Sequence, residues 1–200
     1  MKNQLKAKSV FIAFYSMLCL YSCNSNYTFK PRGYYKIDFP EKEYQEFNQP
    51  GYPFSFEYPT YATIAKDTSF FEEKPENPYW LNIDFPQLSG RIYISYKEVG
   101  KNNIDSLVND AFTMSYKQHT YKATAIEPMA LITANNISGI YFTLSGNTAT
   151  ANQFFLTDST KNFIRGALYF DATPNEDSLS TVNAFLKKDL EHLINTLKWK

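Results

Sequence analysis

Several residue types are scarce in this chain, and each scarcity excludes a class of protein. Only two of its 200 residues are cysteine, Cys19 and Cys23, so no later pair can form a disulfide. Seven glycines and two histidines leave no phosphate-binding glycine loop, no zinc-protease motif and no Cys–His pair. Lys plus Arg and Asp plus Glu balance at 20 each, so no positive field is available to hold a nucleic acid. We therefore expect no catalytic, cofactor or metal site.

The first 22 residues have the pattern of an export signal. Lys2, Lys6 and Lys8 precede an apolar run from Val10 to Tyr21, with no acidic residue among them. This run is too short for a membrane-spanning helix, which needs ~20 apolar residues, but it fits a signal peptide. It ends in Leu20-Tyr21-Ser22-Cys23, which resembles the lipobox of bacterial lipoproteins, although a small residue is usual in the place of Tyr21.

Cys23 is the predicted site of lipidation, and residues 1–22 are predicted to be removed. Cys19 fits less well because Leu18 would occupy the position of a small residue. An ordinary secretory signal that happens to contain two cysteines is the alternative. Cleavage would leave 17 basic and 20 acidic side chains. Two or three acyl chains on Cys23, including palmitate, would then attach the protein firmly to the membrane.

The remainder divides into a tether and one domain. Residues 23–49 are predicted to form a lipidated tether and extended arm, with a strand-like stretch over 34–40 that ends at Pro40. Residues 50–200 are predicted to form a single α+β domain, because strands alternate with helices and the later connections are short. The element order resembles the Mog1/PsbP-like sandwich, in which an antiparallel sheet is covered by helices.

Hydrophobic periodicity places the elements of this domain. Apolar residues spaced by three or four predict an amphipathic helix over 103–116 and a second helix that ends near Leu197. A capping box over 173–176, with Pro174 at the first helical position, is the expected start of that second helix, with Asp177 or Ser178 as alternative caps. Alternating residues predict strands, over 52–58, 80–85, 91–97, 121–125, 129–133, 137–144, 151–157 and 162–170.

Aromatic side chains are abundant, with 16 Tyr, 17 Phe and 2 Trp. Most are expected in the core, and Tyr34, Tyr35 and Tyr79 are candidates for an interface. His119 follows the first predicted helix and His192 lies within the second, and neither is expected to be catalytic.

The whole chain resembles the GldD family, gliding motility lipoproteins of Bacteroidetes. Several segments in the same order carry the resemblance: 31–40 (PRGYYKIDFP), 54–59 (FSFEYP), 80–86 (WLNIDFP), 146–147 (GN) with 153–159 (QFFLTDS), and 163–170 (FIRGALYF). The resemblance implies a non-enzymatic envelope component required for gliding and for the linked type IX secretion machinery. It would act as a scaffold or an assembly factor for other gliding lipoproteins, and it brings no active-site residues.

The residues after Cys23 indicate where in the cell envelope the protein is expected to lie. Asn24-Ser25-Asn26 lacks the acidic cluster associated with surface export in this phylum, which favours a domain facing the periplasm. We expect attachment to the outer rather than the inner membrane. Three Asp-Ser pairs resemble the O-glycosylation sequence of exported Bacteroidetes proteins, at Ser159, Ser106 and Ser178. Because Asp-Ser also caps helices and starts turns, a purely structural role is the alternative.

Two other functions stay open. A periplasmic lipoprotein could bind a lipid or a glycan in an aromatic cleft, and a hydrolase could act on envelope polymers. A deep apolar cavity would favour the binding protein, whereas an exposed apolar patch would favour the scaffold.

Overall fold

The fold is seen in a computed structural model that describes residues 33, 36–67, 75–117 and 119–200. The chain separates into two compact units, residues 1–37 and 38–200. All the described helices and strands lie in the second unit. Cys23, Tyr34 and Tyr35 lie outside the described residues.

A seven-stranded sheet forms the centre of this unit, and every neighbouring pair of its strands is antiparallel. Its order is β3 (Thr63–Lys66), β4 (Leu81–Phe85), β5 (Gly90–Glu98), β9 (Asn162–Phe170), β8 (Asn152–Thr157), β7 (Ser138–Gly146) and β6 (Ala123–Ile132). A 3-10 turn, η1 (Pro86–Leu88), joins β4 to β5. A second sheet has the order β1 (Tyr44–Phe47), β2 (Phe54–Pro59) and β10 (Lys198–Trp199).

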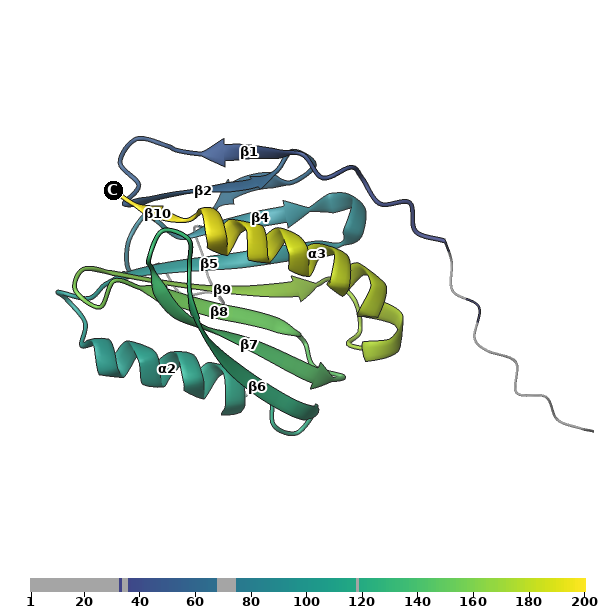
Figure 1. Cartoon of the computed structure of the whole chain (residues 1–200). Helices are drawn as coiled ribbons and strands as arrows, with labels where there is room; N and C mark the ends of the chain where they lie inside the picture. The colour runs from purple at the N-terminus through teal and green to yellow at the C-terminus, as the bar shows by residue number, and fades with distance from the viewer. Residues whose placement is uncertain (1–32, 34–35, 68–74, 118) are drawn as a thin grey trace, which may run out of the picture. The chain divides into compact units, whose positions relative to one another are not determined.

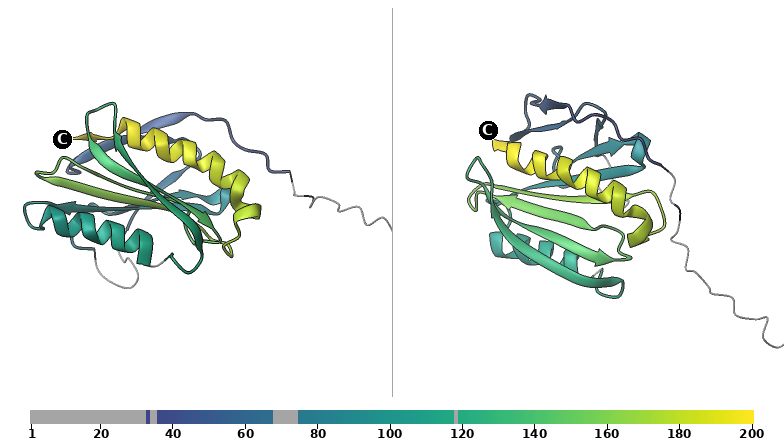
Figure 2. Two further views of the ribbon diagram at one scale, coloured as in Figure 1. Left: turned by 60° about the horizontal axis from the view of Figure 1, so that its bottom comes forward. Right: turned by 45° about the vertical axis from the view of Figure 1, so that its right-hand side comes forward.

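Two helices cover the large sheet from opposite sides (Figures 1 and 2). One is α2 (Ile104–Lys117), and the other is α3 (Glu176–Thr196), which lies on the same side as β1 and β2. The prediction of an α+β domain, an antiparallel sheet covered by two main helices, is confirmed.

Each face of the large sheet has its own core. On the α3 side, leucines at positions 186, 190 and 193 pack against the inner strands and against phenylalanines 54 and 56 of the small sheet. On the α2 side, Leu107 and Ala111 pack against Phe142, Phe155 and Phe163. Since adjacent residues of a strand point to opposite faces, Phe155 and Leu156 can enter different cores. Full burial of each such side chain stabilises the fold by roughly 1.5–3 kcal/mol.

The start of α3 differs from the prediction. Asn175 is the N-cap, with extended backbone angles, and its side-chain oxygen accepts a hydrogen bond from the backbone N–H of Ser178 at 2.9 Å. The prediction of a capping box that starts at Thr173 is therefore wrong, and Pro174 lies before the helix. Asparagine is among the best N-cap residues because its short side chain reaches the N–H three positions later.

The arm also differs in detail. Residues 36–40 form no strand, and the first strand is β1, which pairs with β2 from Tyr44 opposite Pro59 to Phe47 opposite Phe56. The segment predicted as an extended arm thus contributes a strand to the folded unit. Pro40 precedes this strand, where its missing N–H costs no ladder hydrogen bond.

One strand, β6, replaces two predicted ones. The expected strands over 121–125 and 129–133 form a single strand that continues through Pro128. Proline is tolerated there because β6 is the edge of the sheet, so a missing N–H need not break a ladder.

Candidate functional site

A buried carboxylate attaches the N-terminal arm to α3. The Asp189 side chain is fully buried, and its Oδ1 lies 2.6 Å from Lys42 Nζ. The hydroxyl of Tyr44 donates to Oδ1 at 2.9 Å, and that of Tyr61 donates to Oδ2 at 2.5 Å. We call these four residues the Asp189 cluster. Burial, and then the hydrogen bond to Asp189, raise the pKa of Tyr44 and of Tyr61, so both hydroxyls keep their protons.

The arm follows one stripe of α3 beside this cluster. Phe39 stacks on Phe185 with ring centroids 4.3 Å apart, and Lys42 Nζ lies 3.7 Å from the centroid of the same ring. About two turns beyond Phe185 on α3, Tyr44 stacks on His192 at 3.6 Å, and His192 Nε2 lies 2.7 Å from a Glu57 carboxylate oxygen. Residues spaced by four and three lie on one face of a helix, so the arm is held along about two turns of α3.

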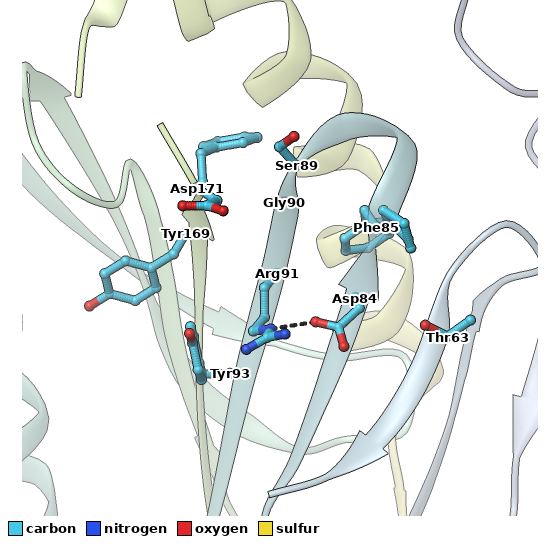
Figure 3. A pocket seen from close by; sticks show the side chains of 11 residues that line it. Thr63, Asp84, Phe85, Ser89, Gly90, Arg91, Tyr93, Tyr169 and Asp171 are labelled. Atoms are coloured by element: carbon cyan, nitrogen blue, oxygen red, sulfur yellow. Dashed lines mark hydrogen bonds and ion pairs between the residues drawn. The ribbon is translucent and has the colours of Figure 1, made fainter. Parts of the chain in front are cut away.

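A groove lies on the large sheet over strands β3, β4, β5 and β9. The register places four side chains in one row: Thr63 is opposite Asp84, Asp84 opposite Arg91, and Arg91 opposite Tyr169. Figure 3 shows this row, with Arg91 between Asp84 and Tyr93. We call this hollow of about 760 Å³ the sheet groove, lined by Thr63, Asp84, Phe85, Pro86, Ser89, Gly90, Arg91, Tyr93, Tyr169, Phe170 and Asp171.

Charge and aromatic rings alternate across the sheet groove. Arg91 forms an ion pair with Asp84, and its guanidinium carbon lies 5.5 Å from the ring centroid of Tyr93. Tyr93 and Tyr169 meet edge to face, with ring centroids 5.5 Å apart. Hydrogen bonds to Asp84 and to Tyr93 raise the pKa of Arg91, so the guanidinium stays charged.

The opposite edge of the large sheet exposes apolar side chains. Strand β6 has ten residues, and Met129 and Ile132 are 61% and 71% exposed. Between β6 and α3 lies a hollow of about 190 Å³, whose lining includes Met129, Leu131, Tyr141 and Ile194. Natural edge strands are usually short or guarded by charges, yet Glu127 is the single charged residue of β6. We call this surface the β6 edge.

A polar group is buried under the end of α2. Arg165 donates to the side-chain oxygen of Gln153 at 2.6 Å, and Ser115 donates to the same oxygen at 3.1 Å. His119 is buried nearby, and its Nε2 has no hydrogen-bond partner among the described residues. Burial, and then the positive charge of Arg165, lower the pKa of His119.

We expect acid to destabilise the fold through His119. Its pKa is lower in the folded protein than in the unfolded chain, where it is about 6.5. The folded state therefore has its full stability above that value and loses stability as the pH falls through it. Urea unfolding at pH 7.5 and 5.5 should show a larger loss for wild type than for His119→Gln. An equal loss in both proteins would contradict this, since His192 is present in each.

The predicted glycosylation serines are all exposed. Ser159 lies in the turn between β8 and β9, with a φ of 61°. Ser106 lies in the first turn of α2, and Ser178 lies in the first turn of α3, where its hydroxyl contacts Asn175 Oδ1 at 2.9 Å. The structure thus brings none of the three together.

Tyr79 stays a predicted interface residue, and part of its side chain packs in the core. Its ring is partly buried against the main core and meets Tyr52 and Tyr96 edge to face, with centroids 5.7 and 5.6 Å apart. Neither the Asp189 cluster nor the sheet groove was predicted from the sequence. The predicted strands over 80–85 and 91–97 indicated that Asp84 and Arg91 lie close together, but only the register of the structure places them opposite each other.

No group of three or more His, Cys, Asp or Glu side chains in the described part of the chain could hold a metal ion. Within the same residues, no helix is both long and apolar enough to cross a membrane. The described part of the chain has three features that could serve a function: the Asp189 cluster, the sheet groove and the β6 edge.

Comparison with known proteins shows the family of the chain. The family described as "Gliding motility lipoprotein GldD" matches residues 24–199, and the chain belongs to that family. No curated protein matches the chain. Among solved structures, the solution structure of cyanobacterial PsbP (CyanoP) from Synechocystis sp. PCC 6803 is similar over 86% of this chain and 99% of that chain, at 9% identity and a TM-score of 0.45.

Proposed function

We propose that this protein is a lipid-anchored scaffold or assembly factor of the cell envelope, required for gliding and for the linked type IX secretion machinery. It faces the periplasm from the outer membrane and binds other gliding lipoproteins without catalysing a reaction. Membership in a family of gliding motility lipoproteins supports the process and the anchor.

The proposed binding role rests on the exposed apolar side chains of the β6 edge. Exposed apolar side chains cost solvation free energy, and groups of them mark interaction sites in soluble domains. Met129 and Ile132 lie on the same ten-residue strand, and Leu131 and Ile194 continue the apolar surface into the neighbouring hollow. A partner that covers this surface would remove those side chains from water.

Acylation of Cys23 would hold the β6 edge near the membrane. The family match begins at residue 24, directly after the proposed acylated position. The 14 residues between Cys23 and the start of the folded unit at Asp38 can span at most about 50 Å. Confinement to such a layer raises the effective concentration of other anchored proteins, so weak contacts at the β6 edge suffice.

O-glycosylation is proposed at Ser159 first, and at Ser106 and Ser178 after it. The turn that presents Ser159 is firmly held, because Asp158 accepts backbone N–H bonds from residues 160, 161 and 162. Burial alone would raise the pKa of Asp158, but these bonds and the Asn162 amide outweigh it and lower that pKa to about 2. An intact mass of envelope-derived protein equal to peptide plus acyl groups would contradict the modification.

Photo-crosslinking in gliding cells tests the β6 edge as the partner site. A crosslinking amino acid at position 129 or 132 should give discrete crosslinks to other anchored envelope proteins. The same amino acid at position 101, whose lysine side chain is 71% exposed, is the matched control. Equal crosslinking from all three positions, or none from 129 and 132, would contradict the proposal.

A further inference from the structure

We propose that the sheet groove is a binding site for a neutral oligosaccharide. The proposal is independent of the β6 edge, which lies at the other end of the same sheet. It rests on the order of side chains in one row, on the net charge of the groove and on the part of the sheet that it occupies.

The row is built by the strand register. Thr63, Asp84, Arg91 and Tyr169 come from four adjacent strands, β3, β4, β5 and β9. Tyr169 lies an even number of residues after Phe163, which packs against α2, so the row points to the α2 side of the sheet. Neighbouring strands are about 4.8 Å apart, so the row extends over about 15 Å. That length suits an elongated ligand of several similar units.

The charges of the groove exclude two classes of ligand. Asp84 and Asp171 contribute two negative charges and Arg91 contributes one positive charge, so the lining carries a net charge of about −1. Arg91 is already paired with Asp84, so phosphate or carboxylate groups would meet a balanced or negative site. A lipid chain is excluded as well, because it would desolvate both members of the ion pair.

The position of the groove disfavours an extended peptide. Peptides that add to a sheet pair with the free backbone groups of an edge strand. The row instead crosses the face of the sheet, where β4, β5 and β9 each have strands on both sides. A ligand there meets side chains and finds no continuous backbone ladder.

A neutral oligosaccharide can form favourable contacts with both the charged and the aromatic side chains of the sheet groove. Its hydroxyls can donate to Asp84 and accept from Arg91, and such hydrogen bonds to charged groups are the stronger ones. Its apolar C–H surfaces can pack on the tyrosine rings at positions 93 and 169, which have an apolar body and a polar tip. The ion pair is also accessible, with side chains 23% and 45% exposed.

Binding of defined oligosaccharides to the full chain tests the site. The protein would be held in a zwitterionic detergent without a sugar head group and applied to an array of neutral and of anionic oligosaccharides. Titration calorimetry would then measure affinity for the best neutral binder. Arg91→Ala and Tyr169→Ala should each weaken it at least tenfold, while Arg91→Lys should weaken it less than Arg91→Ala.

Two controls make the result decisive. Lys101→Ala removes an exposed ion pair outside the groove, and Ile132→Lys alters the β6 edge, so both should bind sugar as wild type does. Thermal unfolding of each variant confirms that it is folded; surface ion pairs contribute little to stability. The proposal is overturned if no neutral oligosaccharide binds, if anionic ones bind better, or if folded Arg91→Ala and Tyr169→Ala keep wild-type affinity.

Discussion

Replacing Asp189 by alanine should lower the free energy of unfolding by about 3–5 kcal/mol. The substitution leaves the Lys42 ammonium without its carboxylate, and it removes the acceptor for the hydroxyls of Tyr44 and Tyr61. Breaking such a pair by removing one partner is costly because the Lys42 ammonium, on a side chain only 25% exposed, stays partly desolvated. Urea unfolding followed by circular dichroism measures the change directly.

Asp84→Ala is the matched control for that experiment. It also removes one carboxylate from an ion pair, but the Asp84–Arg91 pair is exposed, so a loss under about 1 kcal/mol is expected. Equal losses in the two variants would show that burial does not set the strength of the Asp189 cluster. Since the arm enters the domain through this cluster, the Asp189 variant should also be less abundant in cells.

Placing charges on the β6 edge should abolish function without unfolding the protein. The double substitution Met129→Lys and Ile132→Lys introduces two ammonium groups at positions whose native side chains are more than half exposed. Exposed changes usually alter stability by less than about 0.5 kcal/mol each. Spreading of colonies and secretion should nevertheless fall to the level of a deletion strain, because a partner would have to bury both charges.

The control adds the same two charges elsewhere. Met114→Lys combined with Tyr121→Lys changes two other exposed apolar residues, 39% and 97% exposed, that lie outside β6. This variant should glide and secrete normally. If it fails as the β6 variant does, or if the β6 variant glides, the β6 edge is not the partner site.

Local patterns predicted most elements because the forces that form them are local. The amphipathic spacing over 103–116 gave α2 to within one residue, and alternation gave β9 with its correct bounds. The start of α3 was a local error, whereas the division of β6 into two strands was an error that distant neighbours decide. Pro128 stays inside a strand because β6 is at an edge, a fact of sheet order that no local pattern contains.

The candidate sites were harder to predict than the fold. Lys42 and Asp189 are 147 residues apart, so their contact depends on how β1 packs against α3. Asp84 and Arg91 face each other across a short turn, but the predicted strand bounds would pair Asp84 with Ile92, one residue from the observed register. Thr63 and Tyr169 join that row only through strands from distant parts of the chain.

The central claim is an anchored envelope component needed for gliding and secretion. A deletion strain complemented with wild type or with Cys23→Ala, scored for colony spreading and for secreted protein together, tests it most directly. Wild type should restore both, and Cys23→Ala should restore neither although the protein is made and folded. Normal spreading and secretion in the deletion strain, or full rescue by Cys23→Ala, would contradict it.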